Sequence, residues 1–169
     1  DKLRDMGRFY EAFETPTELD LKRKKQLNMG KPPVYDRAAL ALSDDEKAAL
    51  RAERQGHWRF KLDHERIEWT DGILGDISID AASVSDPVLI RGDGQVLYTL
   101  ASVVDDMDMG VTDVLRGEDH VSNTAVQIQM FTALHGAGVG AEHCSVVDSF
   151  PHFGHTALLV GKEGKLSKR

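Results

Sequence analysis

A short run of β-branched residues between two glycines constrains the fold of this chain more than any other feature. The run VTDVLRG, residues 111–117, is compact and apolar enough for a buried parallel strand. The segment SNTAVQIQMFTALHG after it predicts an amphipathic helix, with Val126, Met130 and Leu134 on one stripe and Gly136 as its end. Further strands are expected in HCSVVDS and HTALLVG. Strands that alternate with helices indicate an α/β sheet.

The first half of the chain predicts a small α+β module. Two helix starts carry a capping box, a Thr or Ser followed three residues later by Glu: Thr15 with Glu18, and Ser43 with Glu46. Large and polar residues alternate in HWRFKLD and RIEWTDG, as is typical of half-buried strands, and RFYEAF is expected to be a short strand. We therefore predict an α/β protein in two parts, a module over residues 1–84 and a sheet layer over residues 85–169.

Two elements are expected between the module and the glycine-bounded strand. PVLIRGDGQVLYTL predicts a hairpin whose two strands flank Gly92-Asp93-Gly94, and ASVVDDMDMG predicts a short helix that ends at Gly110. The acids of this region could form a divalent-metal site: Asp105, Asp106, Asp108 and Asp113. Their spacing does not match an EF-hand loop, so we favour solvated acids at a helix end and predict no metal site.

Composition narrows the class of protein. No apolar run approaches the roughly 18–20 residues that cross a bilayer, and the first twenty residues are too charged for a signal peptide. The single cysteine, Cys144, excludes a disulfide framework and fits a reducing compartment, so we expect a cytoplasmic protein. The net charge of −7 argues against broad nucleic-acid binding. The basic run LKRKKQL is either a solvated helix face or a local phosphate contact: Lys22, Arg23, Lys24 and Lys25.

RGEDH is the first candidate for chemistry. Arg116 stands at the carboxyl end of the glycine-bounded strand, where α/β sheets bind ligands, and a guanidinium can hold a carboxylate through two hydrogen bonds. Asp119 and His120 follow at a helix entrance, which favours anionic ligand groups. The alternative is structural, with Asp119 or Ser122 capping the helix and Arg116 paired with an acid.

GKEGKLSKR at the end of the chain is the second candidate. Lys165 and Lys168 lie three residues apart beside Ser167, on a loop bounded by Gly161 and Gly164. Such a loop can contact a polyphosphate through both its charges and its backbone N–H groups. It is not a Walker A loop, and its alternative is a basic surface tail.

Taken together, the motifs resemble the glutamyl-tRNA synthetases, which are class I aminoacyl-tRNA synthetases. The resemblance covers the whole chain and is most specific in SDPVLIRGDGQVLYTLASVVDDMDMGVTDVLRGEDHVSNT and LLVGKEGKLSKR. KLSKR is similar to the class I KMSKS signature. The resemblance implies the second half of a Rossmann-like catalytic domain over residues 85–169, preceded by an acceptor-stem-binding insertion over residues 1–84. It implies ATP-dependent joining of glutamate to tRNA through glutamyl-adenylate.

The resemblance also implies a role for each candidate residue. Arg116 would pair with glutamate, with Tyr98 and Ser102 in the same pocket. The ATP-binding residues would be Asp119, His120, Leu158, Leu159 and Lys168. Lys165, Ser167 and Lys168 would form the catalytic loop, whose cations neutralise charge on the reacting phosphates. ATP would arrive with Mg²⁺.

The insertion and the missing motifs carry expectations of their own. The basic run from Lys22 to Lys25 becomes a candidate for tRNA contact. Many relatives hold zinc here with cysteines, but Ala12, Glu14 and Ala38 stand at those places, so no zinc is predicted. The HIGH signature of the family does not occur in the chain, which is therefore expected to be an internal segment, inactive alone.

The expected partners are glutamate, ATP and tRNA-Glu, with no membrane, and we expect a monomer. Two alternatives stay open at this point. One is a related synthetase that acts on tRNA-Gln or modifies a tRNA base. The other is a tRNA-binding module without catalysis, although such a module would not need the set YTLAS, RGEDH and KLSKR.

Overall fold

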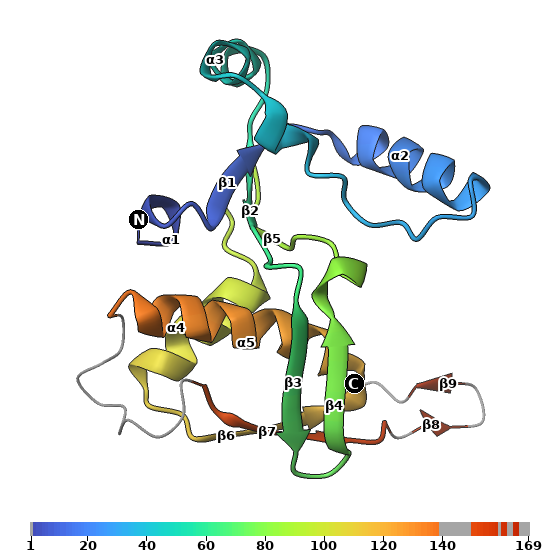
Figure 1. The fold of residues 1–169 in the computed structure, drawn as a ribbon, viewed down its shortest axis with the longest axis vertical. Helices are drawn as coiled ribbons and strands as arrows, with labels where there is room; N and C mark the ends of the chain where they lie inside the picture. Colours follow the sequence, from blue (N-terminus) through green and yellow to red (C-terminus); the bar gives the residue numbers. More distant parts are fainter. Residues whose placement is uncertain (1, 139–149, 159, 162–163, 166–169) are drawn as a thin grey trace.

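The fold comes from a computed structural model, which describes residues 2–138, 150–158, 160–161 and 164–165. Figure 1 shows an upper part with two projecting helices and a lower layer with the longest helix. The upper part contains α1 (Lys2–Asp5), β1 (Phe9–Ala12), α2 (Pro16–Asn28), η1 (Ala38–Ala41), α3 (Asp44–Glu53), β2 (His57–Phe60) and β5 (Val88–Ile90). The lower part contains β3 (Arg66–Asp71), β4 (Gly75–Asp80), η2 (Ala81–Ser83), α4 (Tyr98–Asp108), β6 (Asp113–Gly117), η3 (Glu118–His120), α5 (Val121–Gly136) and β7 (His152–Thr156). Two short strands, β8 (Val160–Gly161) and β9 (Gly164–Lys165), pair with each other near the C-terminus.

The two predicted capping boxes are confirmed. Thr15 and Glu18 exchange hydrogen bonds at the start of α2, and Ser43 and Glu46 do the same at the start of α3. Both carboxylates accept backbone N–H groups, which lowers the pKa of each glutamate. Local side chains therefore determine where both projecting helices begin.

A buried carboxylate holds the upper part together. β1, β2 and β5 form an antiparallel sheet in that order. Beside it, Asp86 accepts two hydrogen bonds from Arg37, at 2.7 and 2.8 Å, one from the Tyr10 hydroxyl at 2.6 Å, and one from the Leu62 backbone at 3.0 Å. Burial and the neighbouring Asp86 raise the pKa of Tyr10, so the phenol stays a donor.

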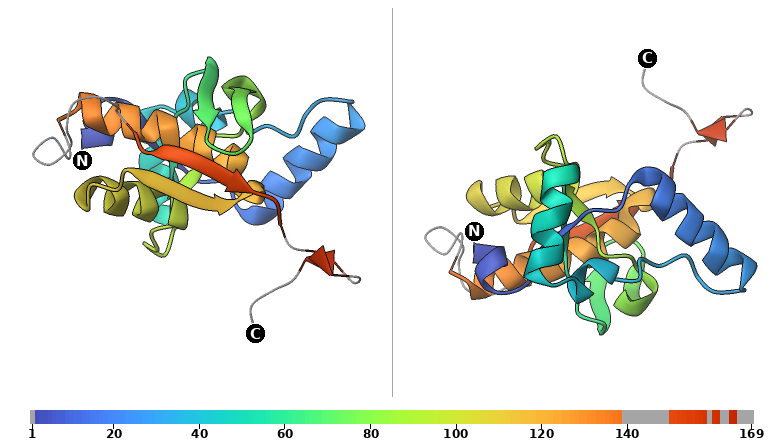
Figure 2. Two further views of the ribbon diagram at one scale, coloured as in Figure 1. Left: turned by 90° about the horizontal axis from the view of Figure 1, so that it is seen from below. Right: turned by 90° about the horizontal axis from the view of Figure 1, so that it is seen from above.

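The lower layer is built on two parallel strands and one buried helix. β6 and β7 pair in parallel, with Arg116 opposite His155, and Figure 2 shows both strands side by side against α5. The strand expected in VTDVLRG is confirmed, but the expected burial of this strand is not, because Leu115 is 73% exposed. In the part of the chain described, β7 is the one strand that pairs with β6. The buried face of α5 is also wider than the predicted apolar stripe. Ten residues of this helix are buried, and the polar residues Thr124 and Gln127 are among them.

The β3–β4 hairpin packs against the lower layer, although it lies in the first half of the sequence. The backbone N–H of Gly72 donates to the Phe153 carbonyl oxygen at 2.8 Å, and Ile67, Trp69 and Phe153 belong to one core cluster. Figure 1 shows the hairpin running down across α5 to the end of β7. Residues about 84 positions apart thus become neighbours.

Two local predictions need correction or lie outside the described residues. The turn expected around Gly92–Gly94 forms, because Arg91 N–H donates to the Gln95 carbonyl oxygen at 2.9 Å and Leu97 N–H donates to the Leu89 carbonyl oxygen at 2.8 Å. The expected second strand is wrong, because Val96 forms an isolated bridge with Ile90 and the chain enters α4 at Tyr98. α4 then ends before Gly110, whose φ of 63° favours glycine. The strand expected in HCSVVDS lies outside the described residues.

Candidate active site

Arg116 is the centre of the candidate site. It lies near the carboxyl end of β6, and its guanidinium has four neutral partners. Nε faces Nε2 of His155 at 3.5 Å, Nη1 donates to the Tyr98 hydroxyl at 3.1 Å, and Nη2 donates to Oε1 of Gln127 at 2.6 Å and to the Thr124 hydroxyl. Its charge also lies 5.5 Å from the ring centre of Phe153. These contacts fix the plane and direction of the guanidinium.

Among the described residues, no carboxylate lies within ion-pair distance of Arg116, and one of its five N–H groups has no described partner. That N–H is on Nη1, the nitrogen that faces the half-exposed Tyr98 side chain. An arginine held by neutral acceptors keeps its full charge for a ligand. The arrangement can therefore bind a small carboxylate from the Tyr98 side.

α4 lines the site through one stripe of the helix. Tyr98, Ser102 and Asp106 are spaced by four residues and so share a face. Ser102 accepts a hydrogen bond from Nε2 of Gln127 at 2.7 Å, which links it to Arg116 through one side chain. Burial raises the pKa of Asp106, and the charge of Arg116 opposes this rise. The structure thus brings together the three residues expected around glutamate: Tyr98, Ser102 and Arg116.

The polar residues behind Arg116 are fully buried. Thr124 and Gln127 on α5 are 0% and 1% exposed, and His155 on β7 is 0% exposed. Nδ1 of His155 meets Asp71 at 2.5 Å, and Asp71 itself is 2% exposed. Burial alone would raise the pKa of Asp71, but hydrogen bonds from the Leu74 backbone and from His155 hold it below its ordinary value, so the carboxylate is ionised.

Three of the expected nucleotide residues lie next to the end of β6. A Cβ at Gly117 would lie 2.6 Å from Oδ1 of Asp119 and 2.7 Å from Cδ2 of Leu158, so both side chains close over this glycine. The ring of His120 packs edge-on against Tyr98 at 5.7 Å. Asp119, His120 and Leu158 are therefore neighbours of the Arg116 site.

The lysine loop falls largely outside the description. Leu159, Ser167 and Lys168 are outside the described residues, and for Lys165 the structure gives only the backbone position in β9. The roles expected for these residues stay predictions.

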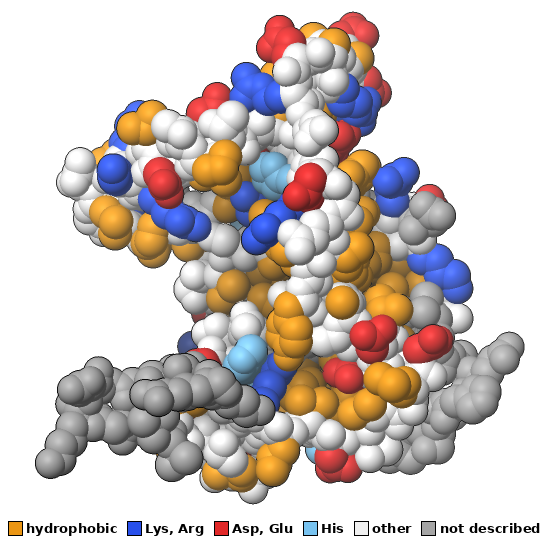
Figure 3. Space-filling view, turned by 180° about the vertical axis from the view of Figure 1, so that it is seen from behind, with side chains coloured by type: hydrophobic (Ala, Val, Ile, Leu, Met, Phe, Trp, Pro, Cys, Tyr) orange, Lys and Arg blue, Asp and Glu red, His pale blue; other side chains and the backbone are white. Residues whose placement is uncertain are grey.

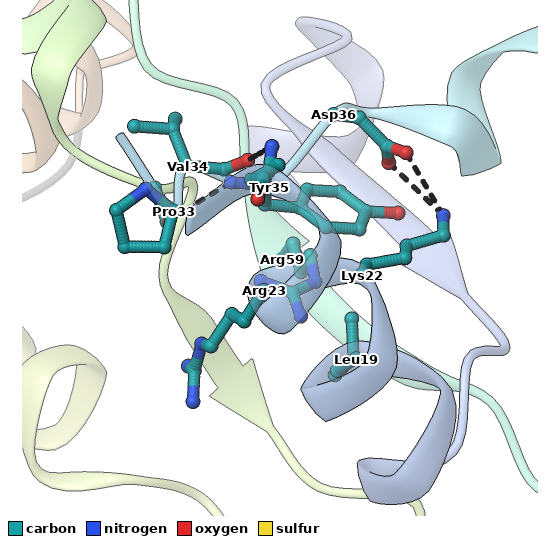
Figure 4. A pocket seen from close by; sticks show the side chains of 10 residues that line it. Leu19, Lys22, Arg23, Pro33, Val34, Tyr35, Asp36 and Arg59 are labelled. Carbon is teal, nitrogen blue, oxygen red and sulfur yellow. Dashed lines mark hydrogen bonds and ion pairs between the residues drawn. The ribbon is translucent and has the colours of Figure 1, made fainter. Parts of the chain in front are cut away.

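The basic run on α2 divides into two pairs. Lys22 is held by Asp36 at 3.0 Å and Glu14 at 3.5 Å, and Arg23 lies 3.6 Å from Asp20. Figure 4 shows Lys22 reaching Asp36 while Arg23 points away from it. The other pair, Lys24 and Lys25, is exposed and has no ion pair among the residues described. α2 buries no residue and stands out from the molecule, so this second pair is open to a ligand.

The described ranges contain neither a metal-binding group of side chains nor a membrane-spanning helix. These residues contain no group of three or more His, Cys, Asp or Glu side chains placed to hold a metal ion. Glu14, one of the positions weighed above as a place for a zinc ligand, accepts a hydrogen bond from the Tyr35 hydroxyl at 2.8 Å. Within the same ranges, no helix combines the length and the hydrophobicity that crossing a bilayer requires.

Sequence reasoning missed the residues behind Arg116. Thr124 and Gln127 stand within the expected helix and could have been noticed, because they follow His120 by one and two helical turns. Asp71 and His155 gave no such signal, because they lie in different strands, far apart in sequence.

Comparison with known proteins identifies the class. The sequence profile described as "tRNA synthetases class I (E and Q), catalytic domain" matches residues 1–169, and the chain belongs to this family. The family and fold expected from the motifs are thereby confirmed, and the fold is that of a class I synthetase catalytic domain.

Individual relatives of the chain are named glutamate–tRNA ligases. The chain is 78% identical to glutamate–tRNA ligase 1 of Ruegeria pomeroyi and 75% identical to glutamate–tRNA ligase 2 of Dinoroseobacter shibae, in each case over 100% of this chain and 36% of the relative. The crystal structure of a glutamate tRNA ligase from Elizabethkingia meningosepticum, in complex with its amino acid, superposes with a TM-score of 0.78 at 27% identity. That match covers 98% of this chain and 33% of the other. The chain thus spans about a third of the length of these relatives.

Proposed function

We propose that this chain is part of a glutamate–tRNA ligase, which uses ATP to form glutamyl-adenylate and then passes the glutamyl group to tRNA. The observation that carries the proposal is Arg116: its guanidinium is held by four hydrogen-bond partners, one of its Nη1 N–H groups has no described partner, and no described carboxylate lies within ion-pair distance of it. The names of the curated relatives support the same activity.

Glutamate would bind between β6 and α4. Arg116 would pair with a carboxylate of glutamate, and the Tyr98 hydroxyl would help to direct it, because the two groups already share a hydrogen bond of 3.1 Å. Ser102 would lie along the same pocket and is held by Gln127. A site with polar groups held in place before the ligand arrives binds at a lower cost in conformational entropy.

ATP would bind on the other side of the β6 end. We assign Asp119, His120, Leu158 and Leu159 to the nucleoside and Lys168 to the phosphates. Lys165, Ser167 and Lys168 would act on the reaction itself, since cations there stabilise the charge that develops as pyrophosphate leaves. Mg²⁺ would arrive with ATP and be bound chiefly by the phosphate oxygens of the nucleotide, as is usual for this ion.

The tRNA would approach the upper part of the molecule. We assign residues 1–84 to an acceptor-stem-binding insertion and residues 85–169 to the catalytic domain. Within the basic run from Lys22 to Lys25, the exposed pair Lys24 and Lys25 is better placed for phosphate than Lys22 and Arg23, which have acidic partners. We assign the protein to the cytoplasm as a monomer.

The test uses a chimaera: the Ruegeria pomeroyi ligase with its matched segment replaced by this chain. With tRNA present, we expect the chimaera to exchange pyrophosphate into ATP only when glutamate is added, and to charge purified tRNA-Glu. Replacement of Arg116 by alanine should nearly abolish the exchange, and the unmodified Ruegeria pomeroyi ligase serves as the positive control.

Each alternative has its own outcome. Charging of purified tRNA-Gln as well as tRNA-Glu would favour a ligase of broader acceptor specificity. A folded chimaera that binds tRNA but exchanges no pyrophosphate would contradict the proposal and favour a binding module. Normal activity after Arg116→Ala would contradict the assignment of the glutamate site.

A further inference from the structure

The buried residues behind Arg116 form a continuous hydrogen-bonded chain. Asp71 contacts Nδ1 of His155, Nε2 of His155 lies 2.9 Å from the Thr124 hydroxyl, and that hydroxyl accepts from Nη2 of Arg116. Asp71, His155 and Thr124 are each at most 2% exposed. These hydrogen bonds connect the β3–β4 hairpin to the Arg116 guanidinium across strand β7.

Asp71 is fixed before it meets the histidine. Its Oδ1 accepts backbone N–H groups from Ile73, Leu74 and His155, each at 3.0 Å, which leaves Oδ2 for the imidazole. With the carboxylate ionised, Oδ2 can only accept, so Nδ1 of His155 must carry a proton. One ring nitrogen of His155 is thereby assigned by its partner.

The other ring nitrogen faces one obligate donor and one hydroxyl group. Nε of Arg116 lies 3.5 Å from Nε2 of His155, and an arginine Nε–H can only donate. The Thr124 hydroxyl can turn its single proton to Nε2 at 2.9 Å or to the His120 carbonyl oxygen at 3.2 Å. A proton on Nε2 would point at the Arg116 side, so the arrangement is satisfied when Nε2 carries a lone pair.

We propose that Asp71 and His155 are positioning residues of the glutamate site: Asp71 holds His155 in the tautomer protonated at Nδ1, and the Nε2 lone pair of His155, with the Thr124 hydroxyl, sets the direction of the Arg116 guanidinium. This inference rests on the proposed function, because it takes Arg116 to bind glutamate. A carboxylate that fixes the tautomer of a histidine whose second nitrogen acts on the site is an arrangement known from metal centres and hydrolases.

The sharpest variant of the chimaera is Asp71→Asn. An asparagine oxygen can still accept the three backbone N–H groups, so the hairpin stays anchored. Its NH₂ group would face Nδ1 of His155, which moves the ring proton to Nε2, against Arg116. We expect the KM for glutamate to rise about tenfold or more while the KM for ATP stays within about twofold.

A second pair of variants covers the case in which Asp71→Asn does not fold. Thr124→Val removes the hydroxyl at nearly constant volume and should raise the KM for glutamate as Asp71→Asn does, whereas Thr124→Ser keeps the hydroxyl and should restore the parental KM. The matched control is Asp76→Asn, an exposed aspartate on the same hairpin that accepts only from Thr70 among the interactions described, and it should leave both KM values unchanged.

The outcomes separate this inference from the function on which it rests. A chimaera without glutamate-dependent exchange would overturn the proposed function and this inference with it. An active chimaera in which Asp71→Asn, or Thr124→Val if the first does not fold, lowers only kcat and leaves the KM for glutamate unchanged would overturn this inference alone. In that case, the hydrogen bonds among Asp71, His155 and Thr124 would stabilise the fold without positioning Arg116 for glutamate.

Discussion

Replacement of Arg116 by lysine separates the geometry of the guanidinium from its charge. The arginine directs Nε to one side, toward His155 at 3.5 Å, and Nη1 to the other, toward Tyr98 at 3.1 Å. A lysine keeps the positive charge but has a single nitrogen, which cannot serve both sides at once. The variant therefore loses the paired hydrogen bonds to a carboxylate and retains the electrostatic attraction.

The size of the effect follows from the hydrogen bond that a lysine cannot make. A hydrogen bond to a charged group contributes about 1.5–3 kcal/mol, and a lysine gives up one of the two that a guanidinium offers a carboxylate. This corresponds to a fall of about 10- to 100-fold in kcat/KM for glutamate. The KM for ATP should change by less than about twofold, because the expected nucleotide residues lie beyond Gly117.

The assay is glutamate-dependent pyrophosphate exchange by the chimaera with tRNA present, measured over ranges of glutamate and of ATP. The matched control is Arg91→Lys, because Arg91 is exposed and its described side-chain hydrogen bond, of 3.0 Å, goes to Gln95 in its own turn. Parental kcat/KM for glutamate in Arg116→Lys would refute the reasoning, as would an equal loss in Arg91→Lys.

Three further predictions concern stability, pH and tRNA. Asp86→Ala leaves the Arg37 guanidinium without its carboxylate in a buried site, and the free energy of unfolding of the chain in urea should fall by about 3–5 kcal/mol. Burial lowers the pKa of His57, so unfolding takes up a proton below about pH 6.5; the free energy of unfolding should decrease from about pH 7 to 5, and His57→Gln should flatten this slope in urea titrations. The double change Lys24→Glu and Lys25→Glu should raise the KM of the chimaera for tRNA and reduce the salt slope of tRNA binding by about two, with the KM for glutamate unchanged.

Each of these predictions has a matched control and a contradicting result. Asp76→Ala, at an exposed aspartate, should barely change the unfolding free energy, and an equal loss in both aspartate variants would contradict the first. The control for the second prediction is His64→Gln, because His64 is exposed. If His64→Gln flattened the pH dependence of the unfolding free energy as much as His57→Gln, the effect could not be attributed to the burial of His57. Lys31→Glu tests whether any exposed lysine near α2 has the effect expected of Lys24 and Lys25.

Sequence predicted well the features that local chemistry decides. The starts of α2 and α3 followed from Thr15 and Ser43, whose side chains bond to the backbone three residues on. Strand β6 followed from its β-branched run between glycines, and Tyr98, Ser102 and Arg116 were rightly expected to lie together. The helix starts and the strand depend on interactions between residues close in sequence. The grouping of Tyr98, Ser102 and Arg116 was expected from the family motifs.

Sequence failed where distant segments decide the outcome. The hairpin signal at Gly92–Gly94 was real, but Tyr98 entered a helix, because α4 packs on α5 and that packing is invisible to local propensity. The stripe on α5 was too narrow because β3 covers a second side of the helix. The contact between Asp71 and His155 depends on the same packing, so no spacing rule could have predicted it.

Figure 3 shows the molecule from behind, the face opposite to that of Figure 1. Hydrophobic side chains gather across its middle and lower part. Among the exposed large hydrophobic residues are Val96 and Tyr98, at the entrance to α4, and Val104 on the same helix.

The most direct test is a crystal structure of the chimaera with glutamate bound. We expect a glutamate carboxylate within about 3 Å of Nη1 of Arg116, on the side of Tyr98, with the contact between His155 and Asp71 intact. Glutamate bound elsewhere, or bound with its carboxylates turned away from Arg116, would contradict the account.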